Sequence, residues 1–517
     1  AACVWLASIS TSAMHSQESH WRFLALASAA LSMAIGLVVA GNIVLLAVFW
    51  TFLALAGVLM MDTSARFDGD LRSSRTCLVV LAAGSACLIA GLAVFWVNVR
   101  AVDIRMIAFK LSSGPEAAST ALHGLALRPR FIVEVLLSLW VMSALALFPL
   151  RIWFLSTSRG SALARVVCTV LIGASSVFVF ARFGFLFSQK MLAVFGVLGL
   201  ATAALSALGA MISGTISRAV AQLILAHFGL AVAAVGFGAP RHGLTHAWVS
   251  CVFGTLLLLW SAGIEARAGT GELARLGGLK HKMPLTLWTG LCGVFAAAAF
   301  PPFSAYWSGG GVVDRLFEFG LGQRLRSLLP GLEFVEYVIP VVAVFVVAGV
   351  SFAIFRLCIC VFLGEPRDKQ TLKQARELPI ESILPAALLS LAAIAGAEFL
   401  PVKYAWLKTD LPDRVRSDRL RAEPDAVSVS VPRTFDQMES DQIAADELEA
   451  DEAEIVEFVG LRRVTLSMLL VACASAWGLL LAALAYWPSW TLRKRLRILD
   501  PDWTSKRFGF LRRILGG

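Results

Sequence analysis

The chain has 517 residues, of which 58% are hydrophobic and only 15% are charged. Soluble domains carry about 25% charged residues, so this composition excludes an ordinary water-soluble fold. The net charge of +10 indicates basic loops beside a membrane rather than nucleic-acid binding, because basic and aromatic residues do not interleave on a soluble domain.

Apolar runs of roughly 18 to 25 residues recur along the chain, which is the length of a helix that crosses about 30 Å of hydrocarbon. By this criterion we count about twelve runs, after a short apolar segment at Ala1–Ser10. Because helices satisfy their own backbone in lipid, the predicted fold class is all-α, a polytopic transmembrane helical bundle of about 12–13 spans. The predicted spans are Phe23–Ala40, Ile43–Met61, Thr76–Val97, Phe131–Phe148, Ala162–Phe187, Met191–Ile212, Ala219–Phe237, Ala247–Ile264, Leu285–Phe303, Tyr337–Leu363, Ile383–Leu400 and Thr465–Tyr486.

The predicted organisation has four parts. They are a transmembrane bundle at 1–402, a polar and acidic linker at 403–463, a last transmembrane helix at 464–490 and a basic amphipathic tail at 491–517. Because the chain starts in apolar sequence at Ala1 without Met, we expect further helices upstream.

Two polar regions interrupt the apolar runs. Asn98–Arg130 mixes basic and apolar residues and is consistent with a short interfacial helix. Asp436–Glu457 contains carboxylates and no Lys or Arg, which predicts a solvated, partly disordered linker. A docking arm for a basic partner is the alternative interpretation.

The motifs of soluble catalytic sites are missing from the sequence. It has no glycine-rich phosphate loop, no G-x-S-x-G elbow and no H-E-x-x-H. Cys358 and Cys360 form a C-x-C pair inside an apolar run, without the two further ligands that zinc or an iron–sulfur cluster needs. We therefore interpret them as buried apolar thiols and predict no metal and no cofactor in this chain.

One stretch carries a specific pattern. Leu276–Trp307 reads LGGLKHKMPLTLWTGLCGVFAAAAFPPFSAYW, a basic loop, Met-Pro, a span and Pro-Pro-Phe-Ser. Further landmarks keep order and spacing: GNIVLLAVFWTFLALAGVLMM at Gly41–Met61, FPLRIW at Phe148–Trp153, a helix ending in Gly-x-Gly at Ile216–Gly238, GLTHAWVSC at Gly243–Cys251 and FRLCICVFLGEPR at Phe355–Arg367. In these segments the chain resembles the antiporter-like subunit 5, or L, of respiratory complex I, a proton-conducting membrane transporter family. The resemblance implies an inverted-repeat architecture with broken helices.

The resemblance also implies a proton path, made of a Glu on one helix and Lys residues on two broken helices, joined by His and Lys. Ionisable groups inside a membrane are costly and usually functional. Here most matching positions are neutral. The Glu corresponds to Thr51, a His to Thr169, the first Lys to Ala144, the bridging Lys to Ser250 and the last Lys to Gly309, so that only His246 of this set remains.

Several polar residues in the spans are therefore proton-path candidates. They are His246, His227, Glu134, Ser250, Thr51 and Thr169. His246 has the alternative of a structural hydrogen-bond donor at a helix start, and Glu134 the alternative of a helix-end carboxylate paired with Arg130. Arg165, Arg182 and Arg356 can steer ions in a wet cavity but cannot shuttle protons.

Helix breaks are expected at Pro149, Pro301, Pro302 and Gly309, the first glycine of the triplet Gly309–Gly311. Broken helices expose backbone groups that bind ions or water.

The expected function is a membrane-arm subunit of a complex I type NADH:quinone oxidoreductase, associated with proton translocation coupled to electron transport. At most it is a non-redox subunit of that enzyme. The alternative is a non-conducting structural paralogue in a cation/proton antiporter, a membrane hydrogenase or an inorganic-carbon uptake system, since fold alone does not choose among them. The expected partners are other membrane subunits and the lipid bilayer, without nucleic acid, and the expected location is the bacterial inner membrane.

Overall fold

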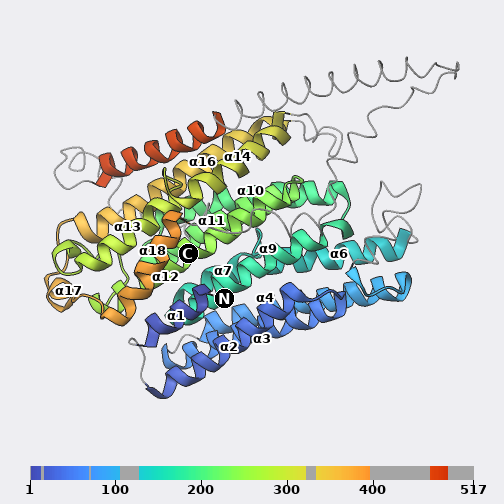
Figure 1. The fold of residues 1–517 in the computed structure, drawn as a ribbon, viewed down its shortest axis with the longest axis horizontal. Coiled ribbons are helices and arrows are strands. Elements are labelled where there is room, and N and C mark those ends of the chain that lie inside the picture. The colour runs from blue at the N-terminus through green and yellow to red at the C-terminus, as the bar shows by residue number, and fades with distance from the viewer. Residues whose placement is uncertain are drawn as a thin grey trace, which may run out of the picture.

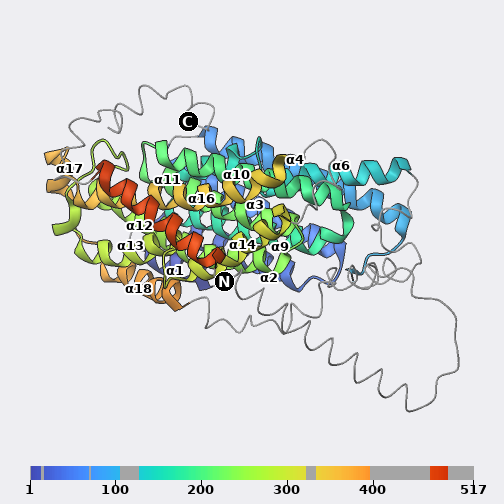
Figure 2. The ribbon, with the colours of Figure 1, turned by 90° about the horizontal axis from the view of Figure 1, so that it is seen from above.

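The computed structural model describes residues 2–12, 17–68, 71–104, 127–321, 334–395 and 466–486. Every regular element within these ranges is helical, and nine of the described helices are long and apolar enough to cross a membrane. The long helices lie side by side along the molecule (Figure 1, Figure 2). The all-α transmembrane prediction is confirmed.

The first helices form one side of the bundle. They are α1 (Ala2–Ser12), α2 (Gln17–Val39), α3 (Ile43–Asp68), α4 (Leu71–Val99) and α6 (Leu127–Ala144). The blue helices α2, α3 and α4 follow one another along the lower edge of Figure 1. Only 28% of the α2 span and 39% of the α4 span is buried, so much of their apolar surface lies on the outside of this chain.

The centre contains one composite span and three long helices. The composite span joins α8 (Ala162–Arg165), the π-helix η2 (Val166–Leu171), α9 (Ile172–Phe183) and the 3₁₀ turn η3 (Gly184–Leu186). The three long helices are α10 (Gln189–Ile212), α11 (Ile216–Gly236) and α12 (Pro240–Ala268). The whole α11 span is buried. A Cβ atom added at Gly236 of α11 would lie 2.4 Å from the backbone nitrogen of Gly196 of α10. The two backbones therefore touch where no side chain fits.

The remaining elements complete the bundle. They are the 3₁₀ turn η4 (Leu279–His281), α13 (Pro284–Ala297), α14 (Ser304–Leu321), α16 (Phe334–Cys358), the π-helix η5 (Ile359–Leu363), α17 (Lys369–Gln374), α18 (Ile380–Ala395) and the last helix, Leu466–Tyr486. The last helix, red in Figure 1, lies along α16, where Ser351 donates a 2.7 Å hydrogen bond to the Ser475 carbonyl.

Two spans are broken before proline. α6 ends at Ala144 and α7 (Ile152–Ser156) with the 3₁₀ turn η1 (Thr157–Arg159) follows Pro149, while α13 ends at Ala297 and α14 follows Pro301 and Pro302. Both helix ends have the same geometry. Ala146 and Ala299 have φ of 51° and 53°, and the next N–H reaches back five residues, Leu147 to Met142 O at 3.0 Å and Phe300 to Phe295 O at 3.1 Å. Identical helix ends in two halves of the chain agree with the expected internal repeat.

Three sequence predictions need correction. The spans expected to reach Phe148 and Phe303 end earlier, at Ala144 and Ala297, because apolarity continues through each break whereas helical hydrogen bonding stops. The prediction of a break at Gly309 is wrong, since α14 runs unbroken through the glycine triplet. Close neighbours explain these glycines: an added Cβ would lie 2.9 Å from the Met468 sulfur at Gly310 and 3.0 Å from the His242 ring at Gly311.

The predicted interfacial helix lies mostly outside the described residues. The acidic linker and the basic tail lie outside them altogether.

Candidate functional site

Two histidines meet in the middle of the bundle. His227 lies halfway along α11 and His246 lies in the second turn of α12, with 3% and 1% of their surfaces exposed. His227 Nδ1 and His246 Nε2 are 3.1 Å apart. α14 supplies a third side chain, because Ser308 Oγ is 3.0 Å from His246 Nδ1. We call His227, His246 and Ser308 the histidine cluster.

The helix break after α13 anchors the cluster. His227 Nε2 is 3.1 Å from the carbonyl oxygen of Ala297, the last residue of α13. The last carbonyls of a helix have no partner within it and need one from elsewhere. The second break therefore supplies the acceptor at which the cluster ends.

The order of hydrogen bonds fixes the tautomers of neutral rings. A carbonyl oxygen only accepts, so Nε2 of His227 carries the hydrogen and Nδ1 of His227 accepts. His246 must then donate from Nε2 and accept at Nδ1 from the hydroxyl of Ser308. All four ring nitrogens are satisfied, and every donor points towards Ala297.

Two neighbours of this cluster, Ser250 and Gly309, carry no titratable group. Ser250, one turn beyond His246, donates its hydroxyl hydrogen to the His246 carbonyl at 2.6 Å. A Cβ atom added at Gly309 would lie 3.8 Å from Cε1 of His246. The structure thus brings His246, His227, Ser250 and Gly309 together, with a neutral residue at both positions where the resemblance implies Lys.

The other candidates lie elsewhere. Thr51 on α3 and Thr169 in η2 each donate to a carbonyl of their own helix, Ala47 O at 2.7 Å and Arg165 O at 2.6 Å. Ala144 is buried at the end of α6. None of these residues contributes a titratable group to the first helix break.

Glu134 caps a helix. Its Oε1 accepts the Ser188 N–H at 3.1 Å and the Ser188 hydroxyl at 2.6 Å, and Ser188 is the N-cap of α10. A carboxylate at a helix N-terminus is favoured by the helix dipole. The side chain of Arg130, its expected partner, is outside the description.

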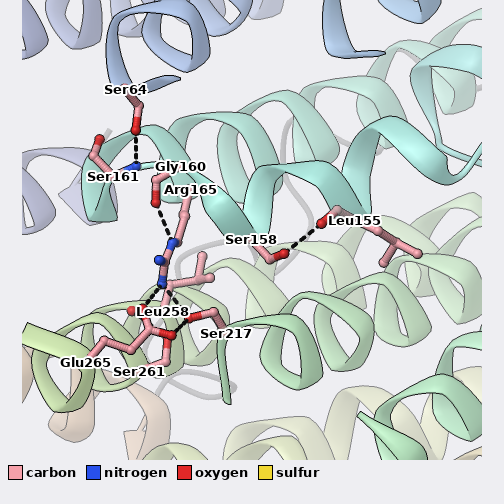
Figure 3. A network of polar contacts seen from close by, with 10 residues as sticks. All are labelled: Ser64, Leu155, Ser158, Gly160, Ser161, Arg165, Ser217, Leu258, Ser261 and Glu265. Atoms are coloured by element: carbon pink, nitrogen blue, oxygen red, sulfur yellow. Dashed lines mark hydrogen bonds and ion pairs between the residues drawn. The ribbon is translucent and has the colours of Figure 1, made fainter. Parts of the chain in front are cut away.

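A second polar group ties three spans at one end of the bundle (Figure 3). Arg165 of α8 lies 2.7 Å from Glu265 of α12 and also donates to Ser217 of α11, which in turn donates to Glu265. The arginine Nε bonds the carbonyl of Gly160 at 2.6 Å. Arg165 could be selected from the sequence as a polar residue within a span, but Glu265 could not, because the two residues are 100 positions apart in the chain and meet only in the folded structure.

Arg151 and Arg356 are also buried, at 3% and 1% exposure. Arg356 donates to the carbonyl of Ser213 at 3.2 Å and lies 5.6 Å from the ring of Tyr486. Both terminal nitrogens of Arg151, beside the first break, have no hydrogen-bond partner among the described residues. Arg151 lies in the FPLRIW segment and places a permanent cation beside the break.

Metal ligands do not gather in the described part of the chain, where no group of three His, Cys, Asp or Glu could hold an ion. Cys358 and Cys360 are buried free thiols.

Comparison with known proteins gives a consistent relationship. The family described as NADH:quinone oxidoreductase/Mrp antiporter, TM, matches residues 40–324. The NAD(P)H-quinone oxidoreductase subunit 5 of Paulinella chromatophora is 24% identical over 367 residues, which cover 68% of this chain and 52% of that protein. The chain spans about half the length of the curated relatives that it matches.

Two solved structures share the fold. A chain of the Mrp complex from Dietzia sp. superimposes with a TM-score of 0.64 at 17% identity, covering 94% of this chain and 47% of that one. A chain of the archaeal membrane-bound sulfane sulfur reductase gives a TM-score of 0.66 at 15% identity, covering 89% and 82%. Since the family match alone includes more than half of the 517 residues, this chain belongs to the NADH:quinone oxidoreductase/Mrp antiporter transmembrane family.

Proposed function

We propose that this chain is a membrane-arm subunit of a complex I type NADH:quinone oxidoreductase and takes part in proton translocation through the histidine cluster. Its partners are other membrane subunits of that assembly, and its location is the bacterial inner membrane. Electron transfer, with its flavin and iron–sulfur centres, belongs to partner subunits. This chain supplies helices and a route for protons.

The observation that carries the proposal is the position of the cluster. Three side chains from three helices form a hydrogen-bonded row that ends on a carbonyl released by a helix break. Imidazole changes its charge near neutral pH and has two nitrogens, so it can take a proton on one side and release it on the other. A row of this kind can replace a lysine relay with fewer titratable groups.

A non-conducting structural paralogue is the second candidate, and Arg151 favours it. A buried guanidinium without a hydrogen-bond partner among the described residues keeps its charge and repels protons. It lies beside the first break, and the chain has Thr51 and Ala144 at the positions where the resemblance implies an acid and a base. Under this interpretation, the first half of the path is closed and the chain holds its neighbours together.

The test uses the intact assembly, purified by a tag on this chain and reconstituted into liposomes. Co-purification of quinone-module and flavin subunits supports the complex I assignment, whereas small antiporter subunits would point to another complex. NADH-driven proton uptake is then compared for the unaltered protein and His246→Gln. We expect the number of protons moved per NADH oxidised to fall in the variant while NADH oxidation continues.

His281→Gln is the matched control, because His281 lies in the short turn η4 outside the long spans. Its proton yield should equal that of the unaltered protein. If His246→Gln and His227→Gln also keep the full yield, conduction through the histidine cluster is wrong and the structural paralogue is favoured.

A further inference from the structure

Arg151 differs from the other arginines inside the bundle. It is 3% exposed, and neither Nη1 nor Nη2 has a hydrogen-bond partner among the described residues. Arg165 instead pairs with Glu265 at 2.7 Å, and Arg356 donates to a backbone carbonyl at 3.2 Å. A buried guanidinium without acceptors is costly, because it keeps its proton and water no longer solvates it. Arg151 therefore needs a partner that the described residues do not supply.

Acidic side chains that lie inside the described bundle already have partners. Glu134 binds the N-cap residue of α10, and Glu265 pairs with Arg165. Asp314 of α14 is 7% exposed and accepts a 2.9 Å hydrogen bond from the last helix. A charge buried in a membrane protein is normally paired. The counter-charge of Arg151 therefore comes from outside the described residues.

The backbone on both sides of Arg151 is fixed by neighbouring segments. Before it, the Phe148 N–H donates to Thr202 Oγ1 of α10 at 3.0 Å. After it, Trp153 Nε1 donates to the carbonyl of Ser143, in the last turn of α6, at 2.7 Å. These bonds hold the residue at the first break, so the backbone cannot carry the guanidinium out to the surface.

The first break can be reached from the outside of this chain. Phe148 and Ile152 flank Arg151 in the sequence and are 42% and 57% exposed. Arg151 is also the only Lys or Arg between Phe131 and Ser158. One positive charge is balanced by one negative charge, whereas a divalent anion would bring a second charge that stays uncompensated. The site therefore fits a monovalent anion.

We propose that the first helix break binds a small monovalent inorganic anion, such as chloride, on the guanidinium of Arg151. Guanidinium has five N–H donors and no acceptor, so an ion with several lone pairs satisfies it. The bound ion balances the one charge of the break, where Thr51 and Ala144 are neutral. The inference does not rest on the proposed function, because an anion is needed whether or not the chain conducts protons.

The test uses the full chain in nanodiscs of uncharged phosphatidylcholine. Chloride replaces gluconate at constant ionic strength, and binding is followed by broadening of the ³⁵Cl NMR line and by the midpoint of thermal unfolding. We expect saturable broadening and a midpoint that rises with chloride, because a ligand of the folded state stabilises it. Arg151→Met should weaken the apparent chloride affinity by roughly tenfold or more.

Two further variants separate ion binding from structure. Arg151→Lys keeps the positive charge and should retain saturable binding. Arg66→Met is the matched control, because Arg66 is an arginine whose side chain is 74% exposed, and its chloride affinity should equal that of the unaltered chain. In gluconate, Arg151→Met should unfold at or above the midpoint of the unaltered chain, since it removes a buried charge without a partner. Equal chloride affinity in Arg151→Met and the unaltered chain, or equal losses in Arg151→Met and Arg66→Met, would overturn the proposal.

The intact assembly distinguishes a bound ion from an acidic side chain of a neighbouring subunit. The same chloride titration is made with the assembly that contains the unaltered chain and with the one that contains Arg151→Met. We expect the difference seen with the isolated chain to persist. If the two assemblies respond alike, a neighbouring carboxylate neutralises Arg151 and the anion site is wrong. This outcome is independent of the proton yield of His246→Gln, so the proposed function and the anion site can fail separately.

Discussion

Two neutral imidazoles and a hydroxyl can lie inside a membrane bundle because every polar atom has a hydrogen-bond partner and no charged group has to be buried. His227 and His246 achieve this by bonding to each other and to groups on α13 and α14. The histidine cluster therefore stores no charge until a proton arrives.

The hydrogen-bond order predicts one tautomer for each buried ring. In ¹⁵N spectra of the full chain in nanodiscs, His227 and His246 should both carry hydrogen on Nε2 and none on Nδ1, because the row ends on a carbonyl. His281, in the turn η4, serves as the reference ring. A protonated Nδ1 on neutral His227 would contradict the assigned row.

Gly309 offers a place to restore a titratable group. An added Cβ meets its nearest atom, Cε1 of His246, at 3.8 Å, which is an ordinary contact. We expect Gly309→Lys to assemble and to increase proton uptake by the reconstituted assembly, because an amine then lies beside the cluster.

The matched control is Gly309→Met, which has similar length and no charge. Uptake should rise only with Lys. An equal rise with Met would mean that packing rather than titration changed.

At the scale of helices, the two breaks share one backbone geometry. Proline marks each break in the sequence, but α6 already ends at Ala144 and α13 at Ala297. Two residues beyond each helix end, Ala146 and Ala299 are in the left-handed region. The prolines were predicted because they remove a hydrogen-bond donor. The left-handed alanines were not, since glycine is the usual residue at that position.

This geometry predicts that Ala146→Gly and Ala299→Gly stabilise the fold. Each removes a left-handed penalty of about 1–2 kcal/mol and adds about 0.5–1 kcal/mol of backbone entropy cost. The net gain should be roughly 0.5–1 kcal/mol per site, seen as a higher thermal midpoint in detergent.

Ala204→Gly, inside the regular helix α10, should instead lose about 1 kcal/mol. If Ala146→Gly and Ala299→Gly lowered the thermal midpoint as Ala204→Gly does, glycine would not stabilise the two breaks and the prediction would be wrong.

At the scale of the molecule, the Arg165–Glu265 pair joins spans that are far apart in sequence. Its side chains are 11% and 21% exposed, so water screens the pair only partly. Family membership did not indicate this pair, and composition could not, because both residues look like ordinary helix-end charges. Their contact exists only once α8, α11 and α12 are packed.

A double-mutant cycle with Arg165→Met and Glu265→Met should give a coupling free energy of about 1–3 kcal/mol, below the cost of breaking a fully buried pair. Each single variant leaves the remaining charged residue without its ion-pair partner. The double variant should therefore recover part of the free energy of unfolding that each single variant loses. Thermal unfolding in detergent supplies the four midpoints.

Arg66 and Asp62 provide the comparison pair, with side chains 74% and 32% exposed. Their coupling should be below about 1 kcal/mol. Equal coupling in the two cycles would contradict a role for burial.

The sequence alone determined that this protein is a helical membrane bundle of the antiporter-like family, and where most spans and both proline breaks lie. These properties follow from apolar length and from the chemistry of single residues, which act locally. Only the tertiary structure decided that His227 faces His246, that Gly309 lies inside an intact helix and that Glu134 caps α10. Such contacts depend on how each helix is rotated and shifted against its neighbours. Side-chain and backbone packing determines this arrangement, for example where the backbones of Gly196 and Gly236 touch.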